Sequence, residues 1–269
     1  MISEMLSYDF IQRAFLGGVL VSLCAALLGV SLVLKRYSMI GDGLSHVSFG
    51  ALSIAIACGI APLKFAIPVV IVAAFLLLRL AENGKMRSDA AIAMVSASSL
   101  AIGVIVTSLT TGLSTDIYSY MFGSILAMSK DDVVVSGLLS VIVIIMFVVC
   151  YHKIFVVTFD ENFSKATGVK VGMYNTLISV FTAITIVVGI KMMGAMLISS
   201  LIVFPSLTSM RIFKSFKSVT ICSAILSVVN FTIGLICSYG FSIPAGASVV
   251  VANLIMYIIF AIVAKVKTM

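Results

Sequence analysis

The chain has 269 residues, of which 62% are hydrophobic and only 10% are charged, and its mean hydropathy is +1.27. A soluble globular protein carries about 25% charged residues, so this chain could not cover a water-facing surface. The composition therefore excludes a soluble enzyme, a nucleic-acid-binding protein and a disordered protein. The formal charge of +7 is spread over short connections rather than gathered in one basic domain, so it does not indicate nucleic-acid binding. The sequence predicts a protein that crosses a membrane several times.

Long apolar runs fill the chain, and each is a candidate span, because a membrane-spanning helix needs about 20 apolar residues. The runs are continuous rather than alternating, which favours helices over strands. The predicted fold is all-α, a transmembrane helical bundle of about nine spans in one domain over residues 1–269. The predicted spans are residues 14–34, 44–60, 62–78, 90–109, 133–151, 174–190, 192–210, 219–238 and 245–264. Only Lys191 divides the sixth span from the seventh, so eight spans are the alternative.

The basic residues are distributed unevenly between the two ends of the predicted spans. Thirteen of the 17 lysines and arginines fall in alternate connections, and only four fall on the other side. Cytoplasmic loops of membrane proteins carry the excess of lysine and arginine. The sequence therefore predicts a multi-pass protein of the cell membrane with its N-terminus outside and its C-terminus in the cytoplasm.

The segment MIGDGLSHVSFG, residues 39–50, contains two ionisable side chains in or near an apolar span. Asp42 and His46 are four residues apart, so on a helix they share one face. A carboxylate oxygen and an imidazole nitrogen together suit zinc, manganese or iron, and intramembrane ionisable residues are functional candidates. The alternative is that Asp42 caps the second helix and His46 is an ordinary core histidine. Two ligands are also too few for a metal site, so further ligands must come from elsewhere.

The polar segment at residues 158–172, TFDENFSKATGVKVG, is predicted to form a short amphipathic helix on the cytoplasmic side. Phe159, Phe163 and Ala166 fall at the spacing of one helix face, and Glu161 falls at the rim of that face. A helix of this kind suits docking in a groove of a soluble partner. A solvated loop is the alternative.

A second mixed segment, residues 116–132, lies on the predicted outer side and combines aromatic, methionine and acidic residues. We interpret it as a gate or as a docking surface for an external donor, with an ordinary interfacial helix as the alternative.

Catalytic motifs are absent from the sequence, and no enzymatic activity is expected. No G-x-x-x-x-G-K-[ST] motif is present to bind ATP in a P-loop, and no H-E-x-x-H zinc-protease helix is present. Ser45 and His46 are adjacent, but neighbours on a helix point about 100° apart and form no dyad.

The chain resembles, in several segments taken in order, the membrane permeases of zinc, manganese and iron ABC importers. The resemblance extends over most of residues 39–253 and implies an all-helical fold similar to the permeases of vitamin B12 and siderophore importers. The segments that carry it are MIGDGLSHVSFG (39–50), SDAAIAMVSASSLAIGV (88–104), FGSILAMSKDD (122–132), FDENFSKATGV (159–169), VGIKMMGAMLISSLIVFPSLTSMRI (188–212) and IPAGASVVVAN (243–253).

The resemblance also implies partners and roles. It implies a homodimer with the transport path between the two copies, cytoplasmic ATP-binding subunits, and a separate external metal-binding protein. Asp42 and His46 match the family's aspartate–histidine pair that lines the metal path. Residues 158–172 match the region expected to contact the ATP-binding subunit. ATP is then bound only by the partner, and no resident cofactor is expected.

The transported metal is predicted to be zinc, because GDGLSHVS, residues 41–48, looks most like the zinc-importer versions of this motif. Oxygen and nitrogen ligands do not by themselves separate zinc from manganese or iron, so both stay as alternatives. A secondary metal transporter or channel that needs no ATPase is a further alternative, and an intramembrane enzyme is disfavoured by the missing nucleophile–base pair.

Overall fold

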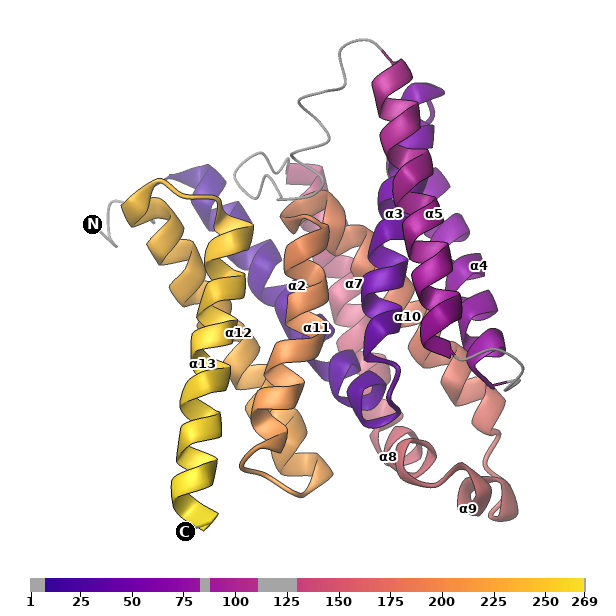
Figure 1. Ribbon diagram of the computed structural model, residues 1–269, viewed down its shortest axis with the longest axis vertical. Coiled ribbons are helices and arrows are strands. Elements are labelled where there is room, and N and C mark those ends of the chain that lie inside the picture. The colour runs from indigo at the N-terminus through magenta and orange to yellow at the C-terminus, as the bar shows by residue number, and fades with distance from the viewer. Residues whose placement is uncertain (1–7, 83–87, 111–129, 269) are drawn as a thin grey trace.

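The computed structural model describes residues 8–82, 88–110 and 130–268, and within these ranges every regular element is a helix. The predicted all-α fold is thus confirmed (Figure 1). The elements are α2 (Asp9–Leu34), α3 (Ser38–Ala57), α4 (Pro62–Glu82), α5 (Ser88–Leu109), α7 (Lys130–Val149), α8 (Tyr151–Phe159), α9 (Glu161–Ala166), α10 (Val171–Met193), α11 (Ala195–Met210), α12 (Phe216–Phe241) and α13 (Ala245–Thr268).

Each of the nine predicted ranges is occupied by a helix, but nine complete spans are not confirmed. Six of the described helices are long and apolar enough to cross a membrane: α2, α3, α5, α10, α12 and α13. A seventh crossing exists if α7 and α8, which meet at a bend of 70°, count as one span. Within the residues whose side chains are described, α4 and α11 give shorter apolar stretches, Pro62–Leu77 and Ala195–Met210.

The division between α10 and α11 falls at Gly194, three residues later than the predicted division at Lys191. Lys191 lies in the last turn of α10. Gly194 has φ +87° and ψ 160°, a conformation that side chains with a Cβ atom rarely adopt. The charge of Lys191 therefore does not end the helix; the freedom of the glycine backbone allows the sharp reversal.

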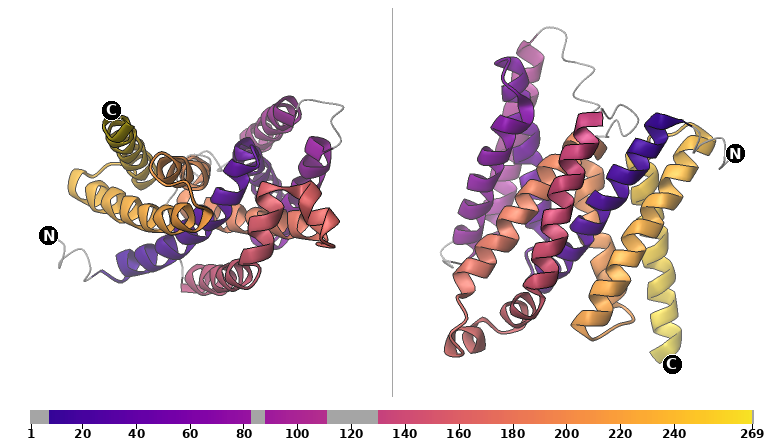
Figure 2. Two further views of the ribbon diagram at one scale, coloured as in Figure 1. Left: turned by 90° about the horizontal axis from the view of Figure 1, so that it is seen from below. Right: turned by 180° about the vertical axis from the view of Figure 1, so that it is seen from behind.

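The helices form two layers, with α13, α11, α3 and α5 along the face seen in Figure 1 and α12, α2, α7 and α10 along the opposite face in Figure 2. In the apolar stretch of α3, 72% is buried inside the protein, whereas in the apolar stretch of α13 only 17% is buried. The outward side chains of α13 are mostly isoleucine, leucine and valine. Lipid tolerates such a surface, so α3 is a central helix and α13 lies at the periphery.

Close backbone contacts hold the central helices together. A Cβ atom at Gly50 of α3 would lie 2.7 Å from the Ser99 carbonyl oxygen of α5. A Cβ atom at Gly29 of α2 would overlap the Ile202 carbonyl oxygen of α11. Small residues allow this approach, which drives helix association in membranes where no hydrophobic force acts between helices.

The two ends of the bundle differ in what they carry. The start of α2 and the end of α13 lie at opposite ends, and the short helices α8 and α9 lie at the end where α13 finishes (Figure 1). The bundle therefore brings the segment predicted to dock a partner to the same end as the C-terminal lysines of α13, Lys265 and Lys267.

Candidate functional site

The two predicted metal ligands lie one turn apart on α3. The Nε2 atom of His46 is 3.7 Å from the Oδ2 atom of Asp42. Because α3 begins at Ser38, Asp42 lies inside the helix and not before it, so the interpretation of Asp42 as a helix cap is wrong. The shared face predicted from the spacing is therefore present.

The Asp42 and His46 side chains are accessible, although their helix is central. Asp42 is 46% exposed and His46 is 24% exposed, whereas Ser45 between them is buried. The Ser45 hydroxyl donates to the Gly41 carbonyl at 2.8 Å and lies 3.0 Å from the hydroxyl of Ser199 on α11. Ser45 thus packs α3 against α11, and it is not directed to a reaction with His46.

Asp42 and His46 form an incomplete ligand set. Across residues 8–82, 88–110 and 130–268, no cluster of three or more histidine, cysteine, aspartate or glutamate side chains could hold a metal ion. Zinc in proteins takes four ligands in structural sites and three protein ligands in catalytic sites. One pair of side chains therefore offers two donor atoms, which is fewer than a complete zinc site requires.

The segment predicted to dock a partner is built from two short helices rather than one. The Asp160 side chain accepts a hydrogen bond from the Phe163 backbone N–H at 2.8 Å and caps α9. After α9, Gly168 has φ +79°. Phe163 is 57% exposed at this end of the bundle, so its ring is available for contact with another molecule.

Phe159 does not share a helix face with Phe163, and the predicted single stripe is wrong in this respect. Phe159 is the last residue of α8, and Asp160 separates it from α9. Its ring is tilted against Phe155 and meets Phe216 edge to face, with centroids 5.1 Å and 6.0 Å away. Phe159 therefore belongs to an aromatic cluster that fixes α8 to the start of α12.

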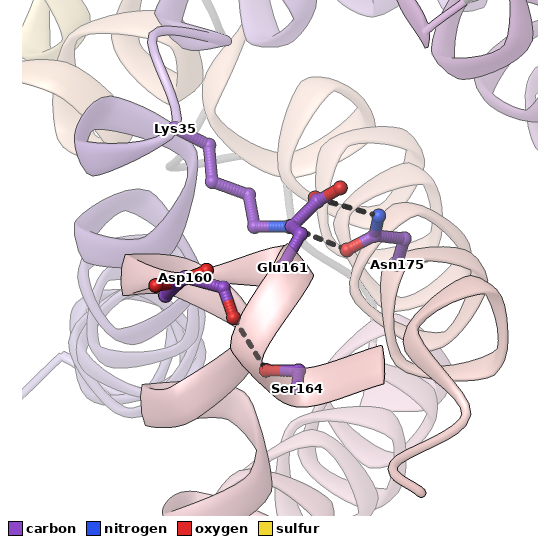
Figure 3. A network of polar contacts seen from close by, with 5 residues as sticks. All are labelled: Lys35, Asp160, Glu161, Ser164 and Asn175. Carbon is purple, nitrogen blue, oxygen red and sulfur yellow. Dashed lines mark hydrogen bonds and ion pairs between the residues drawn. The ribbon is translucent and has the colours of Figure 1, made fainter. Parts of the chain in front are cut away.

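Glu161 is not a solvated rim charge, in contrast to the prediction from spacing. Its Oε1 atom is 2.7 Å from the Nζ atom of Lys35 and accepts a hydrogen bond from the Asn175 amide at 3.1 Å (Figure 3). Lys35 Nζ also donates to the Asn175 Oδ1 atom at 2.5 Å. We call these three residues the Lys35 clamp; they join the end of α2, the start of α9 and the second turn of α10.

Little in the sequence indicates the Lys35 clamp. Lys35 is 126 residues from Glu161 and 140 residues from Asn175, and no local spacing connects them. Lys35 contributes only to the charge count that predicts the membrane orientation. The side chain of Lys35 is 8% exposed, which is unusual for a lysine and is not evident from its apolar neighbours in the chain.

The predicted outer gate or docking segment falls largely on residues 111–129, outside the described residues. Lys130, Asp131 and Asp132 begin α7.

Comparison with known proteins gives matches over nearly the whole chain. A model of the ABC 3 transport family matches residues 7–264. The high-affinity zinc uptake system membrane protein ZnuB of Buchnera aphidicola is 30% identical and is covered over 94% of its length by 91% of this chain. The manganese import system permease protein ScaB of Streptococcus gordonii is 26% identical, and the alignment covers 90% of ScaB and 94% of this chain. The solved structure of PsaBC from Streptococcus pneumoniae in complex with Fab has 26% identity and a TM-score of 0.87, covering 97% of this chain and 95% of that chain.

The stability of the protein should depend on pH through Glu161. Burial acts to raise the pKa of Glu161, but the hydrogen bonds from Lys35 and Asn175 and the charges of Lys35 and Lys165 outweigh it and hold the pKa below its ordinary value. A depressed carboxylate pKa contributes stability that is full above the unfolded-state value, about 4.3, and is lost as the pH falls through the folded-state value.

We therefore expect Glu161→Gln to lower the thermal unfolding midpoint in detergent at neutral pH, and the difference from wild type to vanish in acid. Asp9→Asn, which removes an exposed carboxylate at the opposite end, serves as the control and should show no such convergence. A difference between Glu161→Gln and wild type that stays constant from neutral pH into acid would contradict the role of the ionised carboxylate.

Proposed function

Because the chain belongs to the ABC 3 transport family, as the match over residues 7–264 establishes, we propose that it is the permease of an ATP-driven importer of zinc. The chain is a metal ABC transporter permease, as the sequence predicted, and the relatives that it matches are transport proteins. An ATP-independent transporter is disfavoured by the same membership. The observation that carries the proposed path is the Asp42–His46 pair, two metal-binding side chains held 3.7 Å apart on a central helix.

The choice of zinc rests on the motif at residues 41–48. The relatives do not separate the metals, because two ZnuB proteins are 30% and 25% identical to this chain. Manganese is the second candidate, because the manganese relative ScaB is 26% identical over a similar length. Both ions accept a carboxylate oxygen and an imidazole nitrogen. The ligand pair therefore supports divalent metal transport in either case, and the metal is decided by measurement.

We propose that the importer contains two copies of this chain, with the metal path between them. Each copy offers one Asp42–His46 pair on an accessible face, and two pairs would provide four oxygen and nitrogen donors. Four donors complete a tetrahedral set for zinc. Cytoplasmic ATP-binding subunits would supply the energy, and an external metal-binding protein would deliver the ion.

We expect Asp42→Ala and His46→Ala each to abolish uptake of radioactive zinc by vesicles that contain the chain, its ATP-binding subunit and its metal-binding protein. Each substitution removes one donor atom from the path and leaves the packing of α3 intact, because both side chains are accessible. Met39→Leu, an exposed side chain in the first turn of α3, is the control and should retain uptake. Repeating the assay with manganese identifies the metal. Uptake near the wild-type rate in both alanine variants would return the pair to an ordinary packing role.

We propose that the N-terminus lies outside and the C-terminus in the cytoplasm. The 13-to-four split of the basic residues supports this orientation, and the bundle has the start of α2 and the end of α13 at opposite ends. The test uses a variant that keeps Cys58 as its one native cysteine and carries Thr268→Cys. A membrane-impermeant thiol reagent should label Cys58 from outside, and should label the introduced thiol at the C-terminus only after the membrane is opened. If the C-terminal thiol is labelled from outside and Cys58 only after the membrane is opened, the C-terminus lies outside and the proposed orientation is wrong.

The exposed ring of Phe163 is the proposed anchor for the ATP-binding subunit. A buried aromatic anchor commonly carries about 2 kcal/mol of binding energy, so Phe163→Ala should weaken association roughly thirtyfold. Phe241→Ala is the matched control, since it removes an exposed ring at the last residue of α12, outside the docking segment. Pull-down of the ATP-binding subunit and its hydrolysis rate measure the effect. Equal binding by both variants would place the docking surface elsewhere.

A further inference from the structure

The Lys35 clamp joins the proposed docking helix α9 to the end of α2, next to the helix α3 that bears the proposed metal ligands. Glu161 is the first residue of α9, and Lys35 is the residue that follows the last turn of α2. Only Arg36 and Tyr37 separate Lys35 from the start of α3. The shortest covalent route from the clamp to Asp42 is therefore seven residues, most of them in a helix.

The connection between α2 and α3 leaves little slack. The Lys35 backbone N–H donates to the Ser31 carbonyl at 3.0 Å, the Tyr37 N–H to the Leu32 carbonyl at 2.8 Å, and the Ile40 N–H to the Tyr37 carbonyl at 3.0 Å. Arg36 has φ +61°, which reverses the chain within one residue. A displacement of Lys35 is therefore passed to the first turn of α3 instead of being absorbed by a flexible loop.

The docking helix α9 has two different sides. Phe163 is exposed, whereas Ser164 is buried and donates from its hydroxyl to the Asp160 carbonyl at 2.7 Å (Figure 3). Glu161 is directed to Lys35 and Asn175. One side of α9 is thus free to contact another molecule while the other side is bonded to the chain itself. A force applied at Phe163 reaches Lys35 through one short, capped helix.

We propose that the Lys35 clamp couples movement of α9 to movement of α3, so that the state of the ATP-binding subunit controls the Asp42–His46 pair. This inference rests on the proposed function. Lys35, Glu161 and Asn175 are positioning residues, since they act through α9 and α3 and contact neither metal nor ATP. The clamp spans three helices with three polar contacts, so breaking it separates docking from transport without removing the docking ring.

The decisive measurement is the number of metal ions transported per ATP hydrolysed by the complete importer in vesicles. Lys35→Met keeps the unbranched apolar stem of the side chain and removes its charged end. We expect the ratio to fall about tenfold, within the range of ordinary coupling energies, while the ATP-binding subunit is still retained in pull-down. Lys64→Met, the same substitution at an exposed lysine in the first turn of α4 and outside the docking segment, is the control and should leave the ratio unchanged.

A charge-swapped variant distinguishes coupling from simple folding. Lys35→Glu alone should uncouple transport, and Lys35→Glu combined with Glu161→Lys should restore much of the ratio. The Asn175 amide presents both an oxygen and an N–H group, so it can rotate and bond either arrangement. Restoration of the ratio by the second substitution is a result that loss of packing would not produce.

Two results would overturn the coupling role. One is an unchanged ratio in Lys35→Met. The other is a fall in ratio, subunit retention and unfolding temperature together that the charge swap does not reverse. Failure of the proposed function looks different: the wild-type vesicles themselves would neither retain the ATP-binding subunit nor take up metal when ATP is supplied.

Discussion

The close packing of α3 against its neighbours is the contact on which the arrangement of the site depends. Gly50 brings α3 against the backbone of α5, and the Ser45–Ser199 contact joins it to α11. In a chain with only 10% charged residues, helices associate through small residues and a few polar contacts, not through surface ion pairs. Fixing α3 in this way leaves Asp42 and His46 on the side that its neighbours do not cover.

The features that the sequence predicted correctly depend on information close together in the chain. Apolar runs predict helices because each run forms its own backbone hydrogen bonds in lipid. The i, i+4 spacing placed Asp42 and His46 on one face, and the structure has them 3.7 Å apart. The resemblance to the family also followed from local information, because it is carried by short sequence segments that occur in a fixed order along the chain.

The features that the sequence did not predict depend on contacts between distant residues or on single backbone conformations. Lys35 and Glu161 meet because the end of α2 and the start of α9 lie at the same end of the bundle. The division at Gly194 follows from one positive φ angle, which a charge count at Lys191 cannot reveal. Asp160 caps a new helix and so removes Phe159 from the expected stripe. The number of complete crossings likewise depends on the bend between α7 and α8, which composition does not encode.

Stability alone is a weak explanation for the Lys35 clamp. Removing a lysine charge from water is costly, and Lys35 is 8% exposed. The Lys35 side chain is buried, whereas 38% of the Glu161 side chain is exposed, so the pair is only partly buried. Screening by solvent limits what such a pair adds to folding. An apolar contact between α2, α9 and α10 would serve folding equally well. What an apolar contact lacks is direction. One short bond from the Lys35 ammonium group reaches Glu161 of α9 and a second reaches Asn175 of α10, so the two bonds fix both helices relative to the end of α2, as the proposed coupling requires.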